Sequence, residues 1–172
     1  MRLLIHDLTK EQFDLQFPEM IMEMKTSADD MEIIADDETI NKCMGCFGCW
    51  VKTPGVCVIK DKYQNMGELL SKSEEVIIIS KGFYGGFSPF VKNVMDRSIS
   101  YVLPYFETRN GEMHHKSRYE HQLVMKVWLY GENITEEEKQ TSKALIKANA
   151  MNLACKFSEV KIVGDFKEIT LS

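Results

Sequence analysis

Four of the chain's five cysteines lie between residues 43 and 57, and thiols this closely spaced could bind a metal or exchange disulfides. Cys43, Cys46 and Cys49 are each separated by two residues, and Cys57 follows after seven more. Two-residue gaps let a turning backbone point successive thiolates at one centre. Three close cysteines with one more distant are typical of a [4Fe–4S] cluster, whereas structural zinc more often uses two separated C-x2-C pairs. We therefore predict these four cysteines as cluster ligands.

Two other interpretations of the cysteine segment stay open. Cys46 and Cys49 could form a thiol–disulfide pair, which would leave Cys43 and Cys57 without a role. Alternatively, the segment could be a loop that binds no metal. Cys155 stands alone in a helical pattern and is predicted to be a core residue.

A second candidate site is the stretch "SKGFYGGFSPF", residues 80–90, which directly follows the most apolar run of the chain. Its three glycines would let the backbone approach a flat ligand closely, and its first three aromatic side chains could border an aromatic ring. The alternative is a glycine-rich turn whose aromatic residues belong to the core. Tyr130 and Gly131 end another apolar run and would lie at the same edge of the sheet.

The elements that must position these residues alternate between strand and helix patterns. Five apolar runs predict strands at 2–6, 31–35, 75–80, 123–130 and 160–163. Helical patterns cover 62–72, 89–102 and 135–155, with a short helix expected from Pro18 to about Lys25. Alternation of this kind predicts a parallel sheet with right-handed crossovers. We expect one α/β domain, a flavodoxin-like three-layer sandwich with five strands in the order 2-1-3-4-5.

Three helix starts carry capping signals. Asp61 with Gln64 three residues later fits a capping box, Ser88 precedes a proline, and Thr135 precedes three glutamates. The stretch 103–121 has no clear pattern and is predicted to be a long loop. It contains His114 and His115, and we interpret it as an interface or lid element.

Composition limits the classes of function. The 172 residues suit one domain, and 21 basic against 26 acidic residues give a net charge of −5. This balance argues against a nucleic-acid or membrane partner. The N-terminus lacks the features of a signal peptide, and no apolar run approaches membrane-spanning length, so we expect a cytoplasmic protein.

The motifs "CMGCFGCWVKTPGVCVIKD" and "SKGFYGGFSPFVKNVMDR" resemble those of the flavodoxin-like NAD(P)H-dependent FMN reductases, in particular the iron–sulfur flavoprotein branch. The resemblance covers about residues 30 to 100, where the residues that match the family pattern are Ser80, Gly85, Ser88, Lys92, Asp96 and Arg97. It implies an FMN-binding oxidoreductase, usually a homodimer or homotetramer, that takes electrons from NAD(P)H or a ferredoxin-like donor. In the iron–sulfur branch, four cysteines hold a [4Fe–4S] cluster near the flavin.

The chain departs from this family after the first strand. The family has a loop rich in glycine and hydroxyl residues that binds the FMN phosphate, whereas this chain has "HDLTKEQF". Thr9 followed by Gln12 could cap a helix there, and Lys10 could supply charge. Lys81 and Phe83 also stand where the family has proline and tyrosine.

The resulting hypothesis is an FMN-dependent oxidoreductase or electron-transfer flavoprotein with an unidentified acceptor. The alternative is a degenerate flavodoxin-like module that has lost FMN and acts in metal binding or protein interaction. Asp96 and Arg97 are expected to form an ion pair that positions their helix. The predicted cofactor-binding residues are Thr9, Ser80, Lys81, Gly82, Phe83, Tyr84, Gly85, Gly86, Phe87, Ser88, Tyr130 and Gly131. No side chain is predicted to act as a general acid or base.

Overall fold

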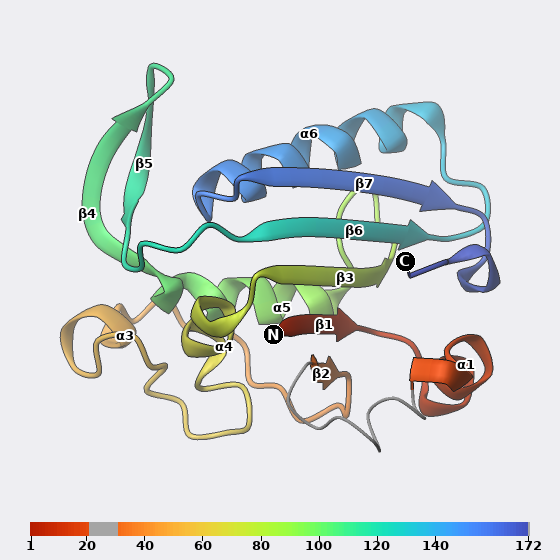
Figure 1. The fold of residues 1–172 in the computed structure, drawn as a ribbon, viewed down its shortest axis with the longest axis horizontal. Coiled ribbons are helices and arrows are strands. Elements are labelled where there is room, and N and C mark those ends of the chain that lie inside the picture. Colours follow the sequence, from red (N-terminus) through yellow and green to blue (C-terminus); the bar gives the residue numbers. More distant parts are fainter. Residues whose placement is uncertain (21–30, 172) are drawn as a thin grey trace.

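A computed structural model describes residues 1–20 and 31–171, and it contains the predicted parallel sheet (Figure 1). The sheet has five strands in the order β2-β1-β3-β6-β7, and every neighbouring pair is parallel. Its strands are β1 (Arg2–His6), β2 (Met31–Ala35), β3 (Glu75–Lys81), β6 (Val124–Tyr130) and β7 (Phe157–Val163). Taken in chain order, this is the predicted 2-1-3-4-5 arrangement, so the α/β, flavodoxin-like fold is confirmed.

The central strand β3 is covered on both faces, as its unbroken apolar run predicts. Val76, Ile77, Ile78 and Ile79 are all at most 2% exposed. Val76 and Ile78 belong to the larger core, and Ile77 and Ile79 belong to a second core on the opposite face. Alternate side chains of a strand point to opposite faces, so β3 holds the two layers of the core together.

Helices cover these two faces unequally. The larger core is closed by α4 (Met66–Lys72), α5 (Pro89–Arg97) and α6 (Glu136–Asn152). The second core is closed by α1 (Lys10–Gln16) together with residues near the C-terminus, including Ile169 in the stretch that follows a short 3-10 helix, Phe166–Glu168. No helix among the described residues combines the length and hydrophobicity needed to cross a membrane.

The stretch predicted to be a long loop is a β-hairpin instead. After α5, a 3-10 helix (Ser98–Tyr101) leads into β4 (Val102–Arg109), which pairs antiparallel with β5 (Glu112–Ser117). Figure 1 shows this hairpin standing apart from the five-stranded sheet. Asn110 and Gly111 both have positive φ and supply the tight turn, a two-residue signal that the sequence prediction overlooked.

Two predicted caps are confirmed and one is wrong. The Ser88 side chain accepts a hydrogen bond from Val91 N–H, and Thr135 forms a full capping box with Glu138. Asp61 caps no helix, because α4 begins only at Met66 after a run of turns. The short helix predicted from Pro18 to about Lys25 falls mostly outside the described residues.

Candidate functional site

A pocket of about 590 Å³ opens at the edge of the sheet where the parallel strands end. We call it the rim pocket. Its walls come from the segments that follow β3, β6 and β7, with Gln12 of α1 at one side. Open α/β sheets bind ligands at this edge. The predicted cofactor residues Lys81, Gly82, Tyr130 and Gly131 all line the pocket, although they come from two different segments.

Asp7, which no motif singled out, fixes one side of the rim pocket. It follows β1, and its carboxylate accepts hydrogen bonds from Lys81 N–H at 2.8 Å and from the Tyr130 hydroxyl at 3.1 Å. Burial raises the pKa of this carboxyl, and hydrogen bonds from Ser88, Lys81 and Tyr130 partly offset the rise. Asp7 therefore joins the ends of three neighbouring strands directly behind the pocket.

Three other predicted cofactor residues are used inside the protein. Ser80 is fully buried, and its hydroxyl accepts from Ser88 N–H at 2.8 Å and donates to Lys81 C=O at 3.0 Å. Ser88 in turn caps α5. Phe87 is 9% exposed and belongs to the larger core, so the alternative of a core aromatic holds for this residue.

The glycine-aromatic loop folds back on itself and packs against α6. Phe83 and Gly86 exchange backbone hydrogen bonds of 3.0 and 2.7 Å, and Tyr84 at the tip is 92% exposed. Gly85 has a φ of +77°, and an added Cβ would lie 2.8 Å from Thr141 Cβ. The close approach that requires this glycine is therefore made to a helix. Contact of these four residues with a ligand stays a prediction.

The loop after β1 offers few free donors to a phosphate. Thr9 and Gln12 form a capping box, in which each side chain accepts the backbone N–H of the other residue. Asp7 N–H is bonded to Ile79 C=O, and Lys10 forms an ion pair with Asp14. A phosphate needs several convergent N–H donors, which these groups no longer supply. The residues of this loop therefore do not form the phosphate-binding site that the family resemblance implies.

His6, the last residue of β1, is also unable to supply positive charge near neutral pH. Its ring is 3% exposed and stacks on Phe13 at 4.4 Å between ring centres. Burial lowers its pKa to about 4, although a backbone hydrogen bond involving Leu8 acts in the opposite sense. The imidazole is therefore neutral in the folded protein.

We expect this buried histidine to make the fold acid-sensitive. Below an unfolded pKa of about 6.5, only the unfolded chain binds the proton, so stability falls as the pH drops from there towards 4. The loss attributable to His6 is on the order of 3 kcal/mol. Urea unfolding at pH 7.5 and pH 5 should show a shallower pH dependence in His6→Phe than in the unmodified protein, and equal slopes would contradict this.

The four clustered cysteines line a second pocket of about 430 Å³, which we call the cysteine pocket. Cys43 and Cys46 are exposed, and Cys49 and Cys57 are half-buried. Burial and the neighbouring thiols raise the pKa of Cys49. Much of the remaining wall is apolar, and polar side chains complete it. The apolar residues are Met44, Phe47, Trp50, Ile59, Met95, Ile99 and Leu153, and the polar ones are Asp96, Arg97, Asn149 and Asn152.

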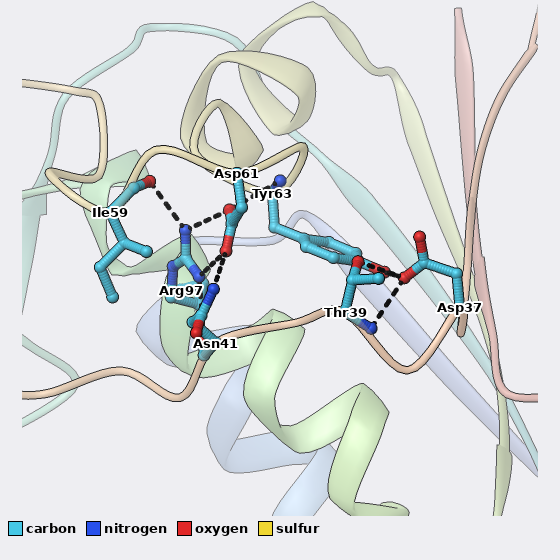
Figure 2. Close-up of polar contacts among 7 residues, drawn as sticks. All are labelled: Asp37, Thr39, Asn41, Ile59, Asp61, Tyr63 and Arg97. Carbon is cyan, nitrogen blue, oxygen red and sulfur yellow. Dashed lines mark hydrogen bonds and ion pairs between the residues drawn. The ribbon is translucent and has the colours of Figure 1, made fainter.

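The segment that carries the cysteines is clamped at both ends by Arg97 (Figure 2). Its guanidinium donates to Asn41 C=O at 2.9 Å before the cysteines, and to Ile59 C=O at 3.4 Å and both Asp61 carboxylate oxygens at 2.8 and 2.9 Å after them. The Arg97 side chain is fully buried and its Nε has no partner. The Asp61 carboxylate also accepts from Tyr63 N–H at 3.0 Å.

The predicted Asp96–Arg97 ion pair is wrong. Asp96 lies one position along the helix from Arg97 and points to a different neighbour, Lys92, with an N–O distance of 2.6 Å. Arg97 instead pairs with Asp61, whose carboxylate also accepts a hydrogen bond from the Asn41 side-chain amide at 3.2 Å. The bonds from Arg97 and Asn41 together lower the pKa of the Asp61 carboxyl to about 2. Arg97 matches the family motif, but the carboxylate that it pairs with belongs to the segment that follows the cysteines.

The two pockets lie at opposite edges of the sheet. The cysteine pocket is bordered by the last residues of α5 and α6, which lie where the parallel strands begin. Figure 1 shows α3 (Gly48–Val51), which carries Cys49, at the far end from α1. Within one chain, the four cysteines and the rim pocket therefore lie far apart, and a cluster beside a flavin stays a prediction. Within residues 1–20 and 31–171, no three His, Cys, Asp or Glu side chains are arranged for a single metal ion.

The sheet order, the crossover helices and a ligand-sized pocket at the carboxyl edge define the class of protein, which is an α/β protein with the flavodoxin-like fold. No family model matches the chain, and no curated protein has a similar sequence.

Solved structures that the chain is similar to include an NADPH-quinone reductase from P. pentosaceus, at 12% identity and a TM-score of 0.53 over 99% of this chain and 88% of that one. An NAD(P)H:quinone oxidoreductase from Methanothermobacter marburgensis gives 13% identity and a TM-score of 0.55 over 96% and 87%. An FMN-dependent NADH-azoreductase from Bacillus anthracis, in complex with FMN, gives 11% and 0.54 over 95% and 86%. At these identities the likeness shows the fold.

Proposed function

We propose that this chain is a flavin-dependent oxidoreductase that binds the flavin ring in the rim pocket. The observation that carries the proposal is the rim pocket itself, which brings together Lys81, Gly82, Tyr130 and Gly131 at the edge where this fold binds ligands. The names of the similar structures, which include quinone reductases and an FMN-dependent azoreductase, support the same reaction class. FMN is the flavin that the sequence resemblance implies.

The residues of the rim pocket would bind and orient the ring. Gly82 N–H is bonded to Tyr130 C=O at 2.9 Å, which holds the two walls in a fixed relation. An added Cβ at Gly82 would lie 3.2 Å from Ile134, so the pocket wall is tightly packed there. Burial and the neighbouring Asp7 raise the pKa of the Tyr130 hydroxyl, which keeps it protonated and bonded to that carboxylate. A bound flavin would supply the electron-transfer chemistry.

We propose further that Cys43, Cys46, Cys49 and Cys57 hold a [4Fe–4S] cluster. All four line one pocket, and thiolates are the ligands that iron–sulfur clusters require. The buried Arg97 guanidinium lines the same pocket with an unpartnered Nε, a donor suited to a negatively charged group. A cubane is larger than a single ion, so its ligands need not approach one another as closely as those of zinc.

The proposal also includes the electron donor and the oligomeric state. NAD(P)H or a ferredoxin-like protein would reduce the flavin, and the chain would form a homodimer or homotetramer. A colourless protein, inert towards NAD(P)H, would instead support the alternative of a module without flavin.

The absorption spectrum of protein purified without oxygen tests both cofactors. At neutral pH we expect the spectrum to contain flavin bands together with broad absorption from the cluster. We also expect the protein to oxidise NAD(P)H when a quinone is added. Cys43→Ser should remove the broad absorption and leave the flavin bands, with Cys155→Ser as the matched control that changes neither. A protein that stays colourless and binds no added flavin would refute the proposed function.

A further inference from the structure

The charges around the rim pocket are mostly negative. Glu132, Glu138 and Asp165 contribute three carboxylates to its lining, and Lys81 contributes the one ammonium group among the lining residues. Hydrogen bonds from Thr135 hold the pKa of Glu138 below its usual range, so this carboxylate stays ionised at neutral pH. A dianionic ligand group would meet net repulsion here, while an uncharged ring would not.

Behind the lining, Asp7 occupies the space between the ends of β1, β3 and β6. Its two oxygens already accept from Lys81 N–H and the Tyr130 hydroxyl. A phosphate oxygen is itself an acceptor, so it would compete with Asp7 for these donors instead of finding its own. The ionised Asp7 carboxylate therefore places acceptor atoms beside donors that a phosphate would need.

The neighbouring helix α1 has part of its N-terminus already used by the protein. The seven-residue α1 has its first turn closed by the Thr9–Gln12 capping box. Lys10 is paired with Asp14, and His6 is buried and neutral. The capping box therefore uses the Thr9 and Gln12 N–H groups of this helix N-terminus, and neither Lys10 nor His6 offers it a free positive charge near neutral pH.

Resting on the proposed flavin function, we propose that the rim pocket selects a flavin without a phosphate group, of the riboflavin type, over FMN. The ring and an uncharged ribityl chain bind without the repulsion described above. The pocket volume of about 590 Å³ lies in the range of small-molecule sites.

Titration of flavin-free protein with riboflavin and with FMN, followed by quenching of flavin fluorescence, tests the selection directly. At low salt we expect riboflavin to bind about tenfold more tightly than FMN, and the ratio to shrink as salt screens the carboxylates. Flavin released from protein purified from cells should have the mass of riboflavin.

Variants that remove a negative charge test whether repulsion of the phosphate causes the preference for riboflavin. Asp7→Asn and Glu132→Gln should each lower the ratio of riboflavin affinity to FMN affinity, because each removes a negative charge that repels only the phosphate. Glu74→Gln, an exposed position just before β3 at the opposite edge of the sheet, is the matched control and should leave this ratio unchanged. If Asp7→Asn does not fold, Glu132→Gln decides alone.

The outcomes separate this inference from the proposed function. FMN binding as tightly as riboflavin, with no change of this ratio in either variant, would overturn the selection and leave a flavin protein. Failure to bind either flavin would overturn the proposed function, and the selection with it.

Discussion

Gly67→Ala is expected to destabilise the protein by about 3 kcal/mol, because no room exists for one added methyl group. Gly67 lies in α4 against the 3-10 helix that follows α5. An added Cβ would lie 2.3 Å from Ser100 Oγ and 2.9 Å from the backbone carbon of Ser100 and the nitrogen of Tyr101. Two of these three contacts are with backbone, so a side-chain rotation cannot relieve them. Urea unfolding would measure the loss.

Two variants identify the cause of this loss. Lys72→Ala, on the exposed side of the same helix, should change the free energy of unfolding by less than about 0.5 kcal/mol. Ser100→Gly in the Gly67→Ala background removes the nearest contact but leaves the backbone contacts, so we expect only partial recovery. A Gly67→Ala protein as stable as the parent would show that the two elements can separate at little cost.

Arg97→Met is expected to cost about 3 to 5 kcal/mol and to release the cysteine segment. The substitution removes the hydrogen bonds to Asn41 and Ile59 and leaves the Asp61 carboxylate without its cation. Trp50, which follows Cys49 and donates to Val102 C=O at 2.9 Å, would report the release through its fluorescence. Arg97→Lys keeps the charge but lacks the planar fork, so an intermediate loss is expected.

Two tests that depend on the charge of Asp61 distinguish loss of the ion pair from loss of the packing of the Arg97 side chain. Its folded pKa of about 2 lies below the usual value, so its stabilising effect is complete above about pH 4 and is lost as the pH falls through 2. The Arg97→Met penalty should therefore be constant between pH 5 and 8. The double variant Arg97→Met with Asp61→Leu should lose less than the sum of the single losses, because no unpaired charge remains. Additive losses would contradict the ion-pair explanation.

The sheet could be predicted because its strands carry local signals. The run Val76–Ile79 is apolar on both faces, and Ser88 and Thr135 are capping residues whose role depends only on the next few residues. The hairpin was missed because its strands are exposed at many positions, as at Tyr105 and Met113, so no apolar periodicity marks them. Such strands are specified by the Asn110–Gly111 turn and by pairing across it.

Many residues of the candidate site could be predicted from the sequence, but the side chains that they bond to could not. Spacing could group the four cysteines, and the loop after β3 could be placed at the carboxyl edge of the sheet. Asp7 has no motif, and its role arises only when β1, β3 and β6 lie side by side. Arg97 was noticed, but adjacency in the chain suggested Asp96, whereas helix geometry turns neighbouring side chains about 100° apart.

The hairpin also has a consequence for how the chain folds. It is inserted between β3 and β6, which pair in parallel from Glu75 and Val124 onwards, so this central pairing must close a long loop of chain. The antiparallel hairpin within that loop closes over a two-residue turn and needs no distant partner. Local pairings form quickly and long-range parallel ones slowly. If the hairpin forms early, it shortens the loop that β6 must close to reach β3, so substitutions in its turn would alter the folding rate of a sheet to which it contributes no strand.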